Sequence, residues 1–387
     1  MEVQLKFGIY YSYWEQEWSA DCLKYVEKVA KLDFDVIEIA AHHLNSYSPA
    51  HIAEVGRSAR DNGVTITAGL GPSEQRNLSS ADPAVRKAGR AFFEETLTNL
   101  AKLEIRVIGG ALHSYWPIDY SKPVDKPGDR ARGLEGISSL ADFAGNLGID
   151  LCLEVLNRFE NHVLNTAEEG VAFVREIGKP NVKIMLDTFH MNIEEDGFGN
   201  AIRTAGPLLG HFHTGENNRR VPGKGRLPWH EIGTALREIG YSGAVVMEPF
   251  VKMGGQVGSD IRVWRDLSDN ADEAQMDEAA RQALAFSRYV LGGEPRDGSA
   301  VVQLADQRLE DGGPVLVDVL GADDRQQLLN PGAVLLCDGL SAQRRPGLPD
   351  KLVNHALAHA PIVRDLRARC KVMLTFIVPP MRRKHAP

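Results

Sequence analysis

Cysteine is scarce in this sequence, and long hydrophobic runs are missing. The 387 residues include four cysteines, Cys22, Cys152, Cys337 and Cys370, which lie far apart and form no Cys-x-x-Cys pair. This pattern argues against a zinc ribbon or a dithiol redox motif and is typical of the reducing cytoplasm. No apolar run approaches the roughly 20 residues that span a bilayer, and the first thirty residues show no signal-peptide pattern. We therefore expect a cytoplasmic protein that does not associate with membranes.

An excess of positive charge is missing as well. Lysine and arginine number 44 against 52 aspartates and glutamates, which gives a formal net charge of −8. An acidic chain attracts nucleic acids and anionic membranes poorly, so we expect neither as a partner. The hydrophobic share of 43% and the charged share of 25% are those of a globular protein.

Aromatic residues are almost absent from the last quarter of the chain. Of the 27 aromatic residues, 26 lie in residues 1–293, whereas nine of the 20 prolines lie in 294–387. The first part has 31 basic and 41 acidic groups, and the second has 13 and 11. We place a boundary near 293 and expect 294–387 to be a weakly folded or disordered extension. Short apolar runs at 315–317 and 372–374 could form strands there, but so few aromatic residues promise only a poor core.

Residues 1–293 alternate between short β-type runs and longer stretches with helical spacing. Helical patterns cover 84–102, 133–147, 167–177, 229–239 and 276–291, Asp82-Pro83 is a typical helix start, and Asn62-Gly63 and Gly148 are typical helix ends. The predicted strands are 6–12, 35–41, 65–70, 106–112, 150–156, 182–189, 208–214 and 243–250.

Eight such β/α units in about 290 residues predict a (β/α)8 TIM barrel over residues 1–293. A doubly wound open sheet is the alternative, but no Gly-x-Gly-x-x-Gly motif follows the first strand.

Four consecutive predicted strands end near a group that can bind a metal. These groups are Glu154, Asp187, His213 and Glu248, and each follows an apolar run. The carboxyl ends of barrel strands meet at one face, so three carboxylates and one imidazole would converge there. A divalent cation would relieve their repulsion. Oxygen and nitrogen ligands without thiolate favour Mn²⁺ or Co²⁺, with Mg²⁺ possible.

Longer motifs make the sequence recognisable. They include GIYYSYWE at 8–15, GGALHSYWPIDYS at 109–121, CLEVLNRFENHVLNT at 152–166, MLDTFHMNIEE at 185–195, GHFHTGENNRRVPGKGR at 210–226 and MEPFV at 247–251. Through residues 6–293 the chain closely resembles the ketose 3-epimerases, the D-tagatose 3-epimerase and D-psicose 3-epimerase family. Residues 294–387 have no counterpart in the family pattern.

The resemblance implies a role for each matching residue. Glu154, Asp187, His213 and Glu248 would be the metal ligands, and Glu154 and Glu248 would also move protons at C3 of the sugar. Further residues would bind the O1 to O3 region of the ketose or line the apolar side of its pocket. The first group is Glu160, His190 and Arg219, and the second is Tyr10, Ala111, Trp116 and Phe250.

The resemblance implies metal-dependent epimerisation of free ketohexoses at C3, between D-fructose and D-psicose and between D-tagatose and D-sorbose. One carboxylate on each face of C3 would serve as base and acid in a two-base transfer through a cis-enediolate. The rival hypotheses are an aldose–ketose or hydroxypyruvate-type isomerase on the same barrel, a barrel nuclease, which the acidic charge disfavours, and a sugar-binding protein without turnover. The resemblance also implies a homodimer or homotetramer.

Two other features near the predicted site remain without an assigned chemistry. His211 precedes His213 by two residues and points the same way in a regular strand, so we place it behind the ligand set. The run Val221-Pro222-Gly223-Lys224-Gly225 lacks the frame of a phosphate-binding loop. We interpret it as a loop near the mouth of the site.

Overall fold

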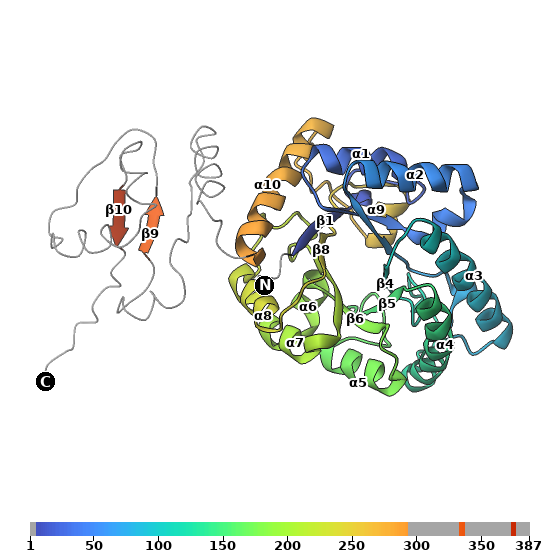
Figure 1. Cartoon of the computed structure of the whole chain (residues 1–387). Coiled ribbons are helices and arrows are strands. Elements are labelled where there is room, and N and C mark those ends of the chain that lie inside the picture. Colours follow the sequence, from blue (N-terminus) through green and yellow to red (C-terminus); the bar gives the residue numbers. More distant parts are fainter. Residues whose placement is uncertain (1–4, 293–332, 337–372, 377–387) are drawn as a thin grey trace, which may run out of the picture. The chain divides into compact units, whose positions relative to one another are not determined.

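The computed structural model describes residues 5–292, 333–336 and 373–376. In the first range, eight parallel strands close into a barrel in the order β1-β2-β3-β4-β5-β6-β7-β8, which confirms the predicted (β/α)8 fold (Figure 1). The strands are Lys6–Tyr10 (β1), Val36–Ala40 (β2), Thr65–Gly69 (β3), Val107–Gly110 (β4), Asp150–Glu154 (β5), Val182–Asp187 (β6), Leu209–Thr214 (β7) and Ala244–Met247 (β8).

The first strand closes the barrel. In β1, Gly8 is paired with Val36 of β2 on one side and with Val246 of β8 on the other. Because all eight strands are parallel, their carboxyl ends meet at one end of the barrel. Side chains that follow the strands are therefore brought together there, whatever their distance in the sequence.

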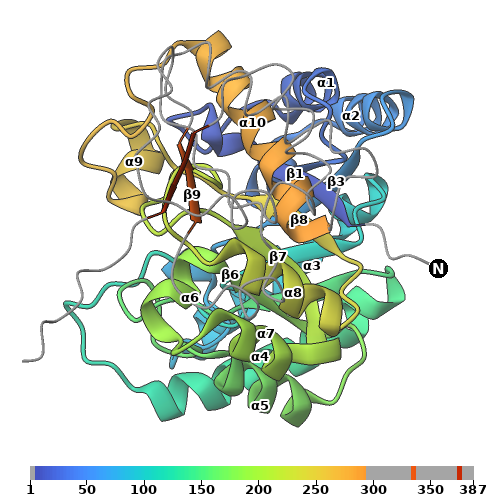
Figure 2. The ribbon, with the colours of Figure 1, turned by 90° about the vertical axis from the view of Figure 1, so that its left-hand side faces the viewer.

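Helices surround the strands, and Figure 2 shows α10 beside β1 and β8. The helices are Cys22–Lys31 (α1), Pro49–Asp61 (α2), Pro83–Lys102 (α3), Lys126–Asn146 (α4), Ala167–Ile177 (α5), Thr188–Glu194 (α6), Phe198–Ala205 (α7), Trp229–Glu238 (α8), Gly255–Ile261 (α9) and Glu273–Gly292 (α10). Short 3-10 turns lie at Tyr11–Tyr13 (η1), Ala41–Ser46 (η2), Glu74–Arg76 (η3) and Gly206–Leu208 (η4).

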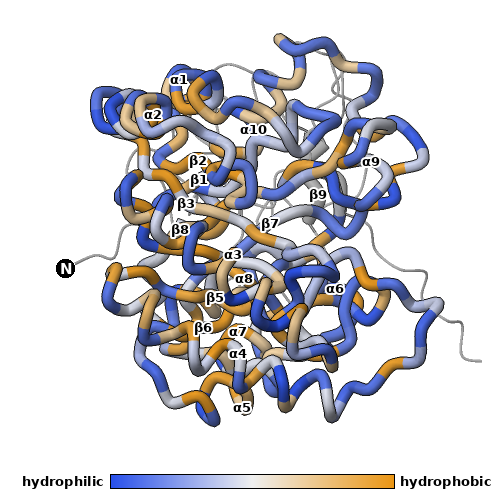
Figure 3. Tube along the Cα trace, turned by 90° about the vertical axis from the view of Figure 1, so that its right-hand side faces the viewer, coloured by the Kyte–Doolittle hydropathy of each residue, from blue (hydrophilic) through white to orange (hydrophobic). Residues whose placement is uncertain are grey.

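The hydrophobic core follows the strands. In Figure 3 the hydrophobic stretches gather along the barrel strands, and many peripheral turns are hydrophilic. All five residues of β2 are buried, as expected for a parallel strand covered on both faces. Four of them are apolar, and the fifth is the carboxylate Glu38, which is fully buried. A buried carboxylate in that position needs hydrogen-bond partners, and Thr67, His211 and His213 supply them.

Local capping chemistry sets several helix ends as the sequence predicts. The Asp82 carboxylate accepts a hydrogen bond from the Ala84 N–H at 2.8 Å, and Pro83 is the first residue of α3. Asn62 ends α2, and Gly63 and Gly148 have φ values of 66° and 67°. Those left-handed conformations suit glycine and stop the helices.

Several predicted boundaries are wrong by two residues or more, such as the ends of the first and eighth strands, which lie at Tyr10 and Met247 instead of 12 and 250. A side-chain cap explains two others. Helix α4 begins at Lys126, seven residues before the predicted start at 133, because the Asp125 carboxylate caps it by accepting from the Gly128 N–H at 3.1 Å. The sixth strand ends at Asp187 instead of continuing to 189. There the Asp187 carboxylate accepts from the Phe189 N–H at 2.7 Å and starts α6.

The chain divides into two compact units, Met1–Gly293 and Glu294–Pro387. In the second unit, Ala333–Leu336 (β9) and Met373–Phe376 (β10) pair antiparallel, and β10 overlaps the predicted strand at 372–374. The predicted strand at 315–317 lies outside the described residues, so the weakly folded extension stays a prediction. Among the helices that the structure describes, none has the length and apolarity needed to cross a membrane.

Candidate active site

Four strand ends bring together the groups that the sequence predicts as metal ligands. Glu154 ends β5, Asp187 ends β6, His213 lies in β7 and Glu248 directly follows β8. One ligand atom from each lies within 4.8 Å of the others. The backbone secures this arrangement, because Asp187 is paired with His213 across β6 and β7 and the Glu248 N–H donates to the Thr214 carbonyl at 2.8 Å.

The His213 imidazole is fixed by a carboxylate that sequence reasoning missed. Its Nε2 lies 2.7 Å from Oε1 of Glu38, which reaches it from β2. Its Nδ1 is buried and has no hydrogen-bond partner among the described residues. Glu38 therefore holds the Nε2 proton and leaves the Nδ1 lone pair free to bind a ligand.

Glu38 is the centre of a buried hydrogen-bond network behind the four predicted metal ligands. Its Oε2 lies 2.6 Å from Nε2 of His211 and accepts a hydrogen bond from the Thr67 hydroxyl at 2.7 Å. The imidazole rings of His211 and His213 are 5.1 Å apart. His211 therefore lies behind the four predicted metal ligands, in contact with Glu38, as its position two residues before His213 suggests.

Arg219 introduces a positive charge among the carboxylates. One guanidinium nitrogen lies 3.1 Å from both Asp187 and Glu248, and another lies 3.5 Å from Glu160. The guanidinium also stacks 3.8 Å from the centre of the Phe189 ring. Arg219 is 5% exposed, so its charge acts at short range with little solvent screening.

His190 lies in the first turn of α6 and faces the same carboxylates. Its Nδ1 accepts a hydrogen bond from the Asn157 backbone N–H at 3.3 Å, which leaves the proton on Nε2. That Nε2 lies 3.4 Å from Glu154 and 3.9 Å from Asp187. Asn157 also donates its side-chain amide to Glu160 at 3.0 Å. Sequence reasoning missed Asn157, whose signal is its place between Glu154 and Glu160.

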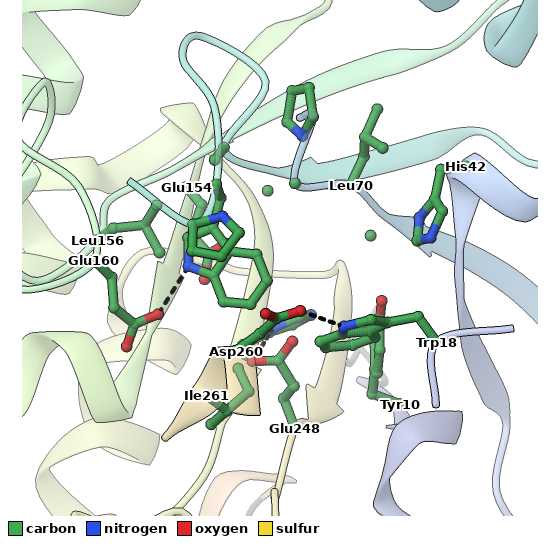
Figure 4. A pocket seen from close by; sticks show the side chains of 18 of the residues that line it. Tyr10, Trp18, His42, Leu70, Glu154, Leu156, Glu160, Glu248, Asp260 and Ile261 are labelled. Carbon is green, nitrogen blue, oxygen red and sulfur yellow. Dashed lines mark hydrogen bonds and ion pairs between the residues drawn. The ribbon is translucent and has the colours of Figure 1, made fainter. Parts of the chain in front are cut away.

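A cavity of about 260 Å³ opens above these groups. Figure 4 shows Glu154 and Glu248 near its centre, with Glu160, Tyr10 and His42 around it. Asp187 is the single predicted site residue that does not line the cavity; it is fully buried beneath it. The ten others line it: Tyr10, Ala111, Trp116, Glu154, Glu160, His190, His213, Arg219, Glu248 and Phe250.

One side of the cavity is aromatic. The Tyr10 ring lies 6.4 Å from the rings of both His213 and Phe250. The Trp116 indole donates to Glu160 at 3.2 Å, and the Trp18 indole donates to Asp260 at 2.9 Å (Figure 4). Sequence reasoning missed Trp18 and Asp260, which lie outside the strand ends. An apolar wall beside charged groups suits a sugar, which presents both C–H and O–H groups.

The surroundings of Glu154 and Asp187 shift the pKa values of these two carboxyl groups in opposite directions. Burial raises the pKa of Glu154 above its ordinary value, although His190 opposes the shift. Burial also acts to raise the pKa of Asp187, but Arg219 and the two nearby histidines outweigh it and lower that pKa. Glu154 is thus the carboxyl group that takes up a proton more readily, and Asp187 stays ionised.

The residues present fit a divalent cation. The donor set combines three carboxylates with one imidazole. Nδ1 of buried His213, which has no hydrogen-bond partner within the described part of the chain, lies 3.6 Å from Glu248. Oxygen and nitrogen donors without thiolate suit Mn²⁺, Co²⁺ or Mg²⁺. Glu38, His211 and His213 form a second close group, but short hydrogen bonds already occupy both Glu38 oxygens.

Comparison with known proteins shows which proteins the chain resembles. Residues 26–281 match the family model of the xylose isomerase-like TIM barrel. The chain is 74% identical over 289 residues to a D-psicose 3-epimerase of Agrobacterium fabrum, which covers 75% of this chain and 100% of the relative. It is 61% identical over 287 residues to a D-psicose 3-epimerase of Ruminiclostridium cellulolyticum, which covers 74% of this chain and 98% of the relative.

The chain belongs to the ketose 3-epimerases. Among the solved structures of ketose 3-epimerases, a D-psicose 3-epimerase crystallised in the presence of D-fructose matches it with a TM-score of 0.74 and 74% identity. The match covers 75% of this chain and all of the other. The part of the chain that resembles a ketose 3-epimerase is therefore a complete barrel of that family.

Proposed function

We propose that the protein interconverts free ketohexoses at C3 with the help of a divalent metal. Its pairs would be D-fructose with D-psicose and D-tagatose with D-sorbose. The observation that carries the proposal is the convergence of Glu154, Asp187, His213 and Glu248 in a chain 74% identical to a D-psicose 3-epimerase. These four residues would hold the metal, with Mn²⁺ or Co²⁺ preferred and Mg²⁺ accepted.

A bound divalent cation supplies Lewis acidity toward the carbonyl and hydroxyl oxygens of the ketose. The protein's own residues would then move the protons. One of Glu154 and Glu248 removes the hydrogen at C3 as a proton, the C–H electron pair becomes the C2–C3 double bond, and negative charge passes to O2. The other glutamate returns a proton to C3 from the opposite face. Glu154 ends β5 and Glu248 directly follows β8, three strands further along the closed barrel.

The remaining polar residues would bind and orient the sugar. His190 would present its Nε2 proton, and Arg219 its guanidinium, to the O1 to O3 region of the sugar, where the negative charge develops. Glu160 would accept hydrogen bonds from sugar hydroxyls while it keeps Arg219 in place. The apolar side would be formed by Tyr10, Ala111, Trp116 and Phe250.

Metal removal tests the proposal. The purified protein is incubated with D-fructose before and after dialysis against a chelator, and again after addition of Mn²⁺, Co²⁺ or Mg²⁺. We expect D-psicose to form, the chelated protein to lose turnover, and Mn²⁺ or Co²⁺ to restore it best. Chromatography separates the ketoses from aldoses. An aldose as the main product would establish an aldose–ketose isomerase, and sugar binding without any product would establish a binding protein.

We also propose that the barrel self-associates as a homodimer or homotetramer. The support is its membership of the ketose 3-epimerases and exposed aromatic and apolar side chains such as Trp264, Phe159 and Met253, which are 70%, 60% and 50% exposed. Sedimentation at micromolar concentration is the test. A single monomeric species would contradict the proposal.

A further inference from the structure

Another buried carboxylate, Glu216, lies in the loop between β7 and α8. It is fully buried, and no lysine or arginine of the described residues forms an ion pair with it. A buried carboxylate is costly unless several hydrogen bonds replace its hydration. Glu216 lies outside the cavity lining, so the proposed chemistry does not account for it.

Three N–H groups satisfy the Glu216 carboxylate. Its Oε1 accepts from the Gly223 backbone at 2.8 Å and from the Trp229 indole at 2.8 Å. Its Oε2 accepts from the Leu227 backbone at 3.3 Å. One side chain thus ties together the whole segment between the end of β7 and the start of α8.

The glycine-rich run at 221–225 is shaped to surround this carboxylate. A Cβ atom on Gly225 would lie 2.2 Å from Oε2 of Glu216, a separation that two such atoms cannot adopt. Gly223 has a φ of 87°, in the left-handed region that glycine favours. This glycine-rich run therefore encloses a carboxylate of its own chain instead of an external anion.

The same residue forms the base of the turn that carries Arg219. The Arg219 N–H donates to the Glu216 carbonyl at 2.9 Å, and the Glu216 N–H donates to the Arg220 carbonyl at 2.9 Å. Arg219 adopts a left-handed φ of 64° at this turn. Its carbonyl in turn accepts from the Phe250 N–H at 2.9 Å, next to Glu248. Backbone hydrogen bonds therefore hold the turn at Glu216, where it begins, and at Arg219 and Arg220, where it ends.

From this geometry we infer that Glu216 is a positioning residue that acts through Arg219. Its carboxylate fixes the loop so that the Arg219 guanidinium is held 3.1 Å from Asp187 and Glu248 before the sugar binds. A non-glycine residue in the left-handed conformation needs such support from its surroundings. The inference rests on the proposed epimerase function, because Arg219 is given its role there.

A double-mutant cycle in the full chain tests the inference. The variants are Glu216→Gln, Arg219→Ala and the double variant, each assayed for D-fructose and D-psicose turnover with metal present. Glutamine keeps the size of the side chain but turns an N–H group toward an N–H donor. We expect Glu216→Gln to lower kcat/KM by about 10- to 100-fold, the effect of losing one charged hydrogen bond. The division between KM and kcat should match that of Arg219→Ala.

The decisive result is the coupling between the two sites. If Glu216 acts through Arg219, then Glu216→Gln has no further effect on kcat/KM in the Arg219→Ala background. If the two losses multiply, or if Glu216→Gln leaves kcat/KM unchanged, the inference is wrong. An inactive wild-type protein would instead contradict the proposed function itself.

A matched control and a second variant complete the test. Glu231 in α8 also accepts from a backbone N–H, that of Gly199 at 2.7 Å, and does not line the cavity. Glu231→Gln should leave kcat/KM within about twofold of wild type. Should Glu216→Gln fail to fold, Gly225→Ala displaces the same carboxylate and must show the same coupling to Arg219, and additivity there would overturn the inference.

Discussion

At the scale of single residues, the pair Glu154 and Glu248 decides the proposed mechanism. Replacing either by glutamine removes one acid–base group but keeps its volume. We expect epimerisation to fall by about three orders of magnitude or more, because paired acid–base groups fail as a unit. Metal content must be measured in each variant. Full metal occupancy with near-normal turnover in Glu248→Gln would contradict the assignment.

The same pair predicts an isotope pattern. Two bases on opposite faces require the new C3 hydrogen to come from a different carboxyl group than the one that took the old hydrogen. Product formed in D₂O should therefore contain deuterium at C3 from the first turnovers, as measured by mass spectrometry or NMR. Retention of most of the original hydrogen would indicate a single base that serves both faces.

Glu38 is a residue whose effect should appear in metal affinity. Its Oε1 lies 2.7 Å from Nε2 of His213 and accepts the proton of that nitrogen in a hydrogen bond, and Glu38 does not line the cavity. Glu38→Gln should weaken metal binding by about 10- to 100-fold, the usual effect of losing such a support. Competition with a chelating dye measures this directly, without reference to turnover. An unchanged metal dissociation constant would show that the ligand set orients His213 unaided.

At the scale of elements, the turn after β4 is locked between α4 and α5 by His113. The His113 side chain is fully buried, and its ring centre lies 6.0 Å from that of Phe173 in α5. The backbone carbonyl of His113 packs against α4 so closely that a Cβ atom on Gly133 would lie 2.6 Å from it. Burial lowers the pKa of His113 to about 3. In this packing the imidazole is therefore neutral at physiological pH.

This contact predicts a dependence of stability on pH. Between pH 6.5 and pH 3 the unfolded state binds a proton that the folded state does not, so the free energy of unfolding falls as the pH falls. At pH 4.5 the loss is about 2 to 3 kcal/mol. Urea unfolding at pH 7 and pH 4.5 should show that His113→Leu removes about this part of the acid sensitivity. The same change at exposed His230 is the control, and equal behaviour of both variants would contradict the prediction.

At the scale of the whole molecule, the barrel contains every residue of the candidate site. Its last helix, α10, ends at Gly292, and the described contacts of the site all lie within Met1–Gly293. Deleting the chain from Glu294 onward should leave kcat/KM and the thermal midpoint nearly unchanged. A truncated protein that remains soluble but loses turnover would show that residues 294–387 contribute to the site.

The sequence by itself determined the fold class and indicated the four strand-end groups that could hold a metal. Barrel strands are short, apolar and regularly spaced, and the groups that follow them must meet at one face because parallel strands end together. The position after an apolar run therefore indicated four candidates for metal binding, which are Glu154, Asp187, His213 and Glu248. Residues such as Glu160 and Arg219 lack this signal, and only the resemblance to the ketose 3-epimerases indicated them.

The tertiary structure alone decided which buried carboxylates lie behind the candidate site. Glu38 meets His213 from a strand that lies 175 residues earlier in the chain. Glu216 meets a loop and an indole whose approach depends on how residues 221–229 turn back. Nothing in the local sequence distinguishes these buried carboxylates from ordinary ones, because their hydrogen-bond partners are set by the closure of the barrel and the path of its loops. The sequence thus specifies which groups can react, and the fold specifies which groups hold them in place.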